Sequence, residues 1–69
     1  KIEEVVNAIF ESDLLTDKER MVIWEHIFEG KGLAEIGREM GYSREYIRQL
    51  KNSALKKIRE RFPQIENLL

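Results

Sequence analysis

Residues 33–50 read LAEIGREMGYSREYIRQL, two short helical patterns separated by a glycine. The apolar spacing of the first pattern predicts a helix over 33–40. Ser43 is a favourable N-cap for a second helix that begins at Arg44. Gly41 accepts the left-handed backbone conformation that a tight turn between them requires. Because so short a turn makes the two helices meet at a steep angle, this stretch predicts a helix-turn-helix.

The side chains of this stretch agree with that motif in detail. Gly37 falls where the second helix crosses close to the first and leaves little volume. A generic helical hairpin does not need Gly37 and Gly41 together, so the pattern favours the helix-turn-helix over a hairpin. The positions where both helices are expected to bury a side chain are Ile36, Met40, Tyr42, Ile47 and Leu50.

Helical spacing continues on both sides of the motif and predicts further helices over about 2–12, 17–29 and 44–61. The helix over 17–29 follows a capping box formed by Thr16 and Glu19. The tail 62–69 is expected either to pack through Phe62, Ile65 and Leu68 or to fray. Since no strand pattern occurs, we expect an all-α fold, a small four-helix domain with a C-terminal helix-turn-helix.

The 69 residues allow one domain, spanning 1–69, and a chain that begins at Lys1 is expected to be a piece of a longer protein. The sequence has no cysteine and one histidine, His26, so neither a disulfide nor a metal site is expected. It has no membrane-length apolar run, and no membrane partner is expected. It also lacks a nucleophile–base pair and a glycine-rich phosphate loop, so we expect no enzyme, no cofactor and no small-molecule substrate.

Charge is distributed unevenly although the net charge is only −1. Residues 1–30 contain three bases and eight acids, a net charge of −5. Residues 31–61 contain nine bases and four acids, a net charge of +5. This division predicts one surface for an anion such as DNA and a second surface for something else.

The predicted helix over 44–61 has two faces when residues are placed about 100° apart. Its core face holds Ile47, Leu50, Ala54 and Ile58. Its first turn contains Arg44, and its opposite face holds Glu45, Arg48, Gln49, Asn52, Lys56 and Arg59. Arginine pairs with guanine in the major groove, glutamine with adenine, and glutamate with cytosine. The N-terminal part of this face is therefore predicted to read bases, and its later part to contact phosphates or a partner protein.

Glu35-Ile36-Gly37, the run from Ser43 to Leu50, and the run from Ala54 to Arg59 resemble the fourth conserved region of bacterial sigma factors. The resemblance covers about residues 12–61. It implies binding of double-stranded promoter DNA at the −35 element by a cytoplasmic, nucleoid-associated bacterial protein. The link from Phe28 to Leu33 is shorter than in housekeeping sigma factors, which favours an alternative or phage-encoded type.

The resemblance also assigns expected roles to individual residues. The expected base-reading residues are Arg44, Glu45, Arg48 and Gln49, and the expected phosphate or flanking contacts are Lys31, Ser43, Tyr46, Asn52, Lys56 and Arg59. Activators would contact Lys56 and Lys57. The flap of the RNA polymerase β-subunit, or an anti-sigma factor, would contact Val5, Ile9, Trp24 and Ile27. Tyr46 stands where a basic residue is common, and Trp24 is either a core residue or an exposed anchor for a partner.

Two other functions fit the same helix-turn-helix. In one, the domain is a repressor or a response-regulator output domain, and such proteins typically form dimers on palindromic DNA. In the other, the helix-turn-helix no longer reads DNA and the domain only docks on polymerase or an inhibitor. The acidic first half of the chain keeps this second alternative open.

Overall fold

The computed structural model describes residues 2–63 and is all-α over that range, as the sequence predicts. Its elements are α1 (Ile2–Glu11), α2 (Asp17–Ile23), the π-helical segment η1 (Trp24–Phe28), α3 (Leu33–Met40) and α4 (Arg44–Arg61). The expected packing of Ile65 and Leu68 lies outside the described residues.

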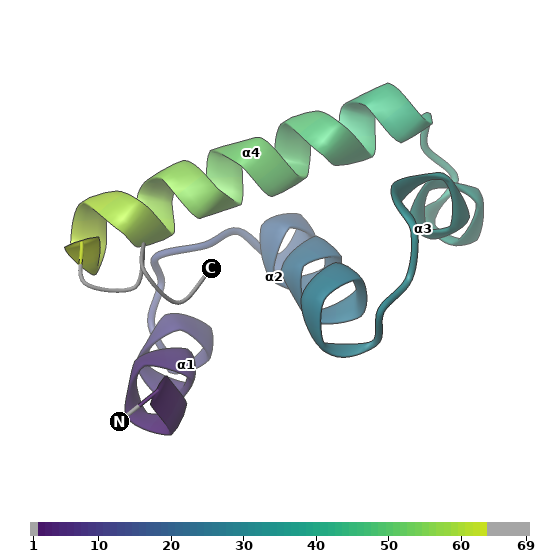
Figure 1. Ribbon diagram of the computed structural model, residues 1–69. Helices are drawn as coiled ribbons and strands as arrows, with labels where there is room; N and C mark the ends of the chain where they lie inside the picture. The colour runs from purple at the N-terminus through teal and green to yellow at the C-terminus, as the bar shows by residue number, and fades with distance from the viewer. Residues whose placement is uncertain (1, 64–69) are drawn as a thin grey trace.

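The long helix α4 runs the length of the molecule, and α1, α2 and α3 are arranged in that order along one side of it (Figure 1). The core consists of two clusters along this contact. The cluster at the C-terminal half of α4 consists of Ala54 and Ile58 from α4 together with Ile9, Leu15 and Ile23. The cluster at its N-terminal half consists of Ile47 from α4 together with Val22 and Ile36. Val22 and Ile23 are neighbours on α2, so this helix connects the two clusters. On the opposite side of α4, no other helix of residues 2–63 lies against it.

The capping box at the start of α2 is confirmed. The Glu19 amide donates to Thr16 Oγ1 at 3.1 Å, and the Thr16 amide donates to Glu19 Oε1 at 2.9 Å. The Glu19 carboxylate, in a residue only 3% exposed, also accepts hydrogen bonds from Ser53 Oγ at 2.7 Å and Lys57 Nζ at 2.8 Å. This one side chain therefore both caps α2 and ties it to α4.

Two predicted helix limits are corrected. The helix expected over 17–29 is α-helical only to Ile23 and continues as the π-helical η1, where the Glu29 amide donates to the Trp24 carbonyl at 3.2 Å. The side-chain pattern did not reveal this change because it alters the hydrogen-bond register while the segment stays helical. The first helix ends at Glu11 rather than at residue 12, and the Ser12 hydroxyl donates to the Ile9 carbonyl just beyond that end.

The predicted core is correct at Ile36 and Ile47, which are fully buried, and wrong at Tyr42, which is 37% exposed. Tyr42 lies outside the core because its ring packs on the ring of Tyr46 at the surface, with 4.8 Å between centroids. Trp24 is 47% exposed, so it is not a core residue, and its role as an anchor for a partner stays a prediction. Ile9, expected on a docking surface, is instead a core residue, 3% exposed.

Candidate nucleic-acid interface

The turn between α3 and α4 is held by two glycines. Gly41 has a φ of 81°, the left-handed conformation predicted for it, and its amide donates to the Gly37 carbonyl. The Tyr42 amide donates to the same carbonyl at 2.8 Å. A Cβ added to Gly37 would lie 2.5 Å from the Tyr42 carbonyl oxygen. The close approach predicted at Gly37 is therefore real, and the backbone of the turn makes it.

The start of α4 is fixed by a cap and by the core. Ser43 Oγ accepts a hydrogen bond from the Tyr46 amide at 3.1 Å, so Ser43 is the N-cap that the sequence predicts. One turn later, Ile47 packs with Ile36 of α3 and Val22 of α2 in a fully buried cluster. These contacts orient α4 relative to α2 and α3 and leave its outer face to solvent.

The residues predicted to contact DNA from that outer face are all exposed. They are Arg44, Glu45, Arg48, Gln49, Asn52, Lys56 and Arg59. We call Arg44, Glu45, Arg48 and Gln49, in the first two turns of α4, the reading face. Their exposure agrees with the rotation of about 100° per residue used to predict it, while their contacts with DNA remain predictions.

Arg48 and Glu45 form a two-bonded ion pair on the reading face. Arg48 Nε donates to Glu45 Oε1 at 2.9 Å, and a terminal nitrogen of the same guanidinium donates to Glu45 Oε2. The Arg48 hydrogen bond lowers the pKa of Glu45, and Glu45 raises the pKa of Arg48, so both groups are charged at neutral pH. An ion pair between two exposed side chains contributes little to stability, because solvent screens it. A base edge can therefore displace Glu45 from Arg48 at little cost.

Two lysines with predicted contacts are paired with carboxylates. Lys31 Nζ lies 2.8 Å from Glu25 Oε1 and 2.9 Å from Glu39 Oε1, and these hydrogen bonds raise the pKa of Lys31. Lys57 Nζ donates to the buried Glu19. The phosphate contact of Lys31 and the activator contact of Lys57 remain predictions, and each requires exchange or sharing of an existing ion pair.

One cation near the reading face was not singled out by the sequence patterns. The Nζ atom of Lys18, in the first turn of α2, lies 5.0 Å from the ring centroid of Tyr42 and 5.9 Å from that of Tyr46. The three residues come from α2, from the turn and from α4. Because 24 or more positions separate Lys18 from either tyrosine, no local spacing could have predicted their contact.

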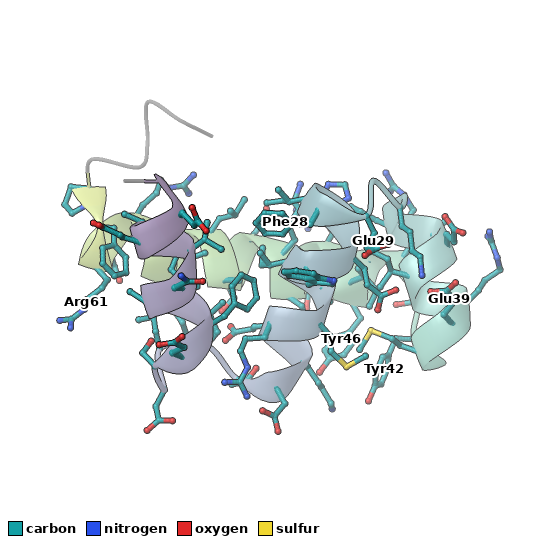
Figure 2. The ribbon with its side chains drawn as sticks, turned by 90° about the horizontal axis from the view of Figure 1, so that it is seen from below. Phe28, Glu29, Glu39, Tyr42, Tyr46 and Arg61 are labelled. Atoms are coloured by element: carbon teal, nitrogen blue, oxygen red, sulfur yellow. The ribbon has the colours of Figure 1, made fainter. Side chains whose placement is uncertain are left out.

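A second surface gathers aromatic side chains where α1 meets α2 and η1. The Phe10 centroid lies 5.7 Å from that of Trp24 and 6.1 Å from that of Phe28, and Trp24 and Phe28 are 4.9 Å apart. We call these three residues the aromatic cluster. Phe28 lies at the opposite edge of the row of helices from Tyr42 and Tyr46 (Figure 2). This member of the aromatic cluster is therefore separated from the pair of tyrosines at the start of α4.

The aromatic cluster borders a hollow of about 480 Å³. Phe10, Met21 and Trp24 form its apolar lining. Its charged lining consists of Arg20, Glu25, Glu29 and Lys31. Ile27, 42% exposed, lies in η1 and faces a small, separate apolar pocket whose lining includes the buried Ile9. Of the residues predicted to dock a partner, Trp24 and Ile27 thus offer exposed surface and Val5 is half-buried.

The described residues provide no group of three His, Asp or Glu side chains that could hold a metal ion. His26 Nδ1 lies 2.8 Å from the Lys31 carbonyl oxygen. Among the helices of residues 2–63, none is both long and apolar enough to cross a membrane.

The helix-turn-helix and the helices packed against it match a known protein family. Residues 13–60 match the family model described as sigma-70, region 4. The chain belongs to the sigma-70 region 4 family. This family is a DNA-binding helix-turn-helix domain of transcription initiation, so the chain is a DNA-binding domain of that kind.

The chain is also similar to bacteriocin UviA of Clostridium perfringens. The two are 46% identical over 46 residues, which make up 67% of this chain and 25% of UviA. The chain thus spans about a quarter of the length of this relative. No solved structure matches it.

Proposed function

We propose that this chain recognises the −35 element of bacterial promoters through the reading face of α4 and docks on the RNA polymerase β-flap through its aromatic cluster. The observation that carries the first part is the joint exposure of four residues at the N-terminal end of a helix whose other side is packed in the core: Arg44, Glu45, Arg48 and Gln49. Recognition helices reach base edges with these first turns. Membership of the sigma-70 region 4 family supports the same proposal.

The chemistry of the reading face suits the major groove. Arg48 already directs two donors at the two oxygens of Glu45, and the O6 and N7 atoms of guanine offer a comparable pair of acceptors. Once Arg48 turns to guanine, the Glu45 carboxylate is available to accept from cytosine N4, and Gln49 can pair with adenine. The net charge of −1 gives little general attraction to DNA, so tethering through polymerase supplies the remaining affinity.

Replacing Arg48 by alanine tests base reading. We expect binding to the preferred duplex to weaken by about 1–3 kcal/mol, with discrimination lost at one base pair, because a bidentate base contact is removed. The measurement is fluorescence anisotropy on a duplex selected from a randomised pool by the unsubstituted chain, together with all single-base variants of that duplex.

Arg59→Ala is the matched control, because Arg59 is an exposed arginine of the same helix but lies about three turns beyond Arg48. It should weaken binding equally on every duplex. A uniform loss for Arg48→Ala as well would show that Arg48 contacts phosphate and would contradict its base-reading role.

The proposed docking partner is an apolar helix of the β-flap, lying in the hollow beside the aromatic cluster. Met21, Trp24 and Phe28 are each about half exposed, a large amount of apolar surface for a chain of this size. The hollow runs along α2 and η1, and its mixed charges can satisfy a polar rim around an apolar helix. The π-helical turn of η1 is the kind of irregularity that often marks a functional site.

Replacing Trp24 by alanine tests this docking. We expect binding to core RNA polymerase to weaken about tenfold, because exposed tryptophans are frequent anchors of protein interfaces. Tyr42→Ala is the control, since it removes an exposed aromatic ring at the opposite edge of the molecule. Circular dichroism establishes that each variant is folded. Unchanged polymerase binding by a folded Trp24→Ala variant would exclude the aromatic cluster as the docking site.

A further inference from the structure

Lys18, Tyr42 and Tyr46 form a compact group beside the reading face. The Lys18 ammonium lies over both rings, and the rings themselves are 4.8 Å apart. Lys18 is exposed, and no carboxylate of residues 2–63 lies within 4.0 Å of its Nζ atom. Contact with the Tyr42 hydroxyl, and to a lesser extent with Tyr46, raises the pKa of Lys18, so it is charged at neutral pH. Among residues 2–63, this cation therefore has aromatic neighbours but no counter-ion.

The group lies on one flank of the recognition helix. Tyr46 is about 60° around α4 from Gln49, toward the side where α2 packs. The same flank carries Ser53 and Lys57 farther along α4, and both contact Glu19, the residue next to Lys18 on α2. The first turn of α2 is thus held against this flank by a buried carboxylate.

The size of the major groove determines what such a flank meets. The groove is about 12 Å wide and an α-helix with its side chains is about 10–12 Å across. A helix that reads bases therefore has a row of phosphates along each side. Given the proposed orientation of α4, the flank that carries Lys18, Tyr42 and Tyr46 faces one of these rows.

We propose that Lys18, Tyr42 and Tyr46 together form a contact with the DNA phosphate backbone, in which Lys18 supplies the charge and the two phenol hydroxyls donate hydrogen bonds. The inference rests on the proposed reading of DNA by α4. Hydroxyl groups and lysines are both frequent phosphate partners.

The aromatic rings should reduce the entropy that Lys18 loses on binding a phosphate, compared with an unrestrained surface lysine. A free lysine side chain loses rotamer entropy when it is ordered, and lysine is among the side chains that lose most. The two nearby rings already restrict the Lys18 ammonium through cation–π attraction. Part of the ordering is thus complete before DNA arrives.

Lys18→Gln is the main test, measured as the salt dependence of binding to the selected duplex and to a scrambled duplex of the same composition. The slope of log K against log salt should fall by about one for both duplexes, since one phosphate charge contact is lost. Affinity should fall several-fold and equally on both. Lys18→Arg keeps the charge and should keep the slope.

Arg20→Gln is the matched control, because it removes one positive charge from the same helix two residues away. Arg20 borders the hollow and pairs with Asp17, so its loss should leave the slope unchanged. Tyr46→Phe keeps the ring and removes the hydroxyl, so it should lower affinity without changing the slope. A Lys18→Gln slope equal to that of Arg20→Gln would overturn the inference.

The same titrations separate this inference from the proposed function. Equal affinity of the unsubstituted chain for the selected and scrambled duplexes would contradict reading of the −35 element, while the slope would still report on Lys18. A clear preference for the selected duplex, combined with an unchanged Lys18→Gln slope, would contradict only the phosphate contact.

Discussion

Replacing Gly37 by valine is expected to lower the free energy of unfolding by about 3 kcal/mol, the upper end of the usual cost of overpacking. A Cβ at this position would lie 2.5 Å from the Tyr42 carbonyl oxygen. This atom belongs to the backbone and cannot rotate away as a flexible side chain could. The turn must therefore shift, which moves α4 relative to α3 and should also weaken DNA binding. For a domain of this size, 3 kcal/mol is a large share of the total stability.

The measurement is urea unfolding followed by circular dichroism, with Gly32→Ala as the control. Gly32 has a φ of −75°, which alanine readily adopts, and no atom lies within 4 Å of a Cβ added there. Its substitution should change stability by less than about 1 kcal/mol. Equal stability of the Gly37→Val and Gly32→Ala chains would show that the α3–α4 turn tolerates a side chain at Gly37.

Replacing Glu19 by alanine is expected to lower the free energy of unfolding by about 2–4 kcal/mol. The change removes half of the capping box and the bonds from Ser53 and Lys57, and hydrogen bonds to a charged group contribute about 1.5–3 kcal/mol each. The full cost of breaking a buried ion pair is not expected, because the Lys57 side chain is 38% exposed and can remain hydrated. Glu60→Ala, which truncates an exposed glutamate of α4, is the control.

The charge of Glu19 also predicts a pH dependence. Burial by itself would raise its pKa, but the hydrogen bonds from Lys57, Ser53 and the Thr16 amide outweigh burial and lower the pKa below its ordinary 4.5. The stability that this charge contributes is complete above the unfolded-state pKa and is lost as pH falls through the folded-state pKa. Glu19→Gln should therefore lose less stability than the unsubstituted chain between about pH 7 and pH 3. Equal losses would mean that Glu19 stabilises the fold without its charge.

Most of the helix-turn-helix could be predicted because its determinants are local. Gly41, Ser43 and the Thr16–Glu19 capping box act on backbone groups only a few positions away. Their geometry depends on the residue types and on little else. The exposed face of α4 could be predicted equally well, since a helix turns by about 100° per residue whatever packs against it.

Reasoning from helical spacing failed where the same spacing fits both a buried and a surface position. An apolar residue such as Tyr42 at a predicted core position can instead find a partner at the surface, and it packs on Tyr46. For Trp24 the sequence left a core position and an exposed position both open, and the residue is about half exposed in the π-helical η1. Periodicity describes one helix at a time and cannot state how much of its apolar side a neighbour covers.

The sequence alone thus accounts for the order of the helices, the glycine turn and the face of α4 that remains exposed, because short-range backbone geometry controls each of them. The tertiary structure decided which distant groups meet. It brought Glu19 to Ser53 and Lys57, which are 34 and 38 positions away, and placed Lys18 over the two tyrosines. These contacts depend on the angle and offset at which α2 packs on α4. The shapes of the buried side chains between the two helices determine this angle and this offset. Neither can be predicted from the spacing of residues along the chain.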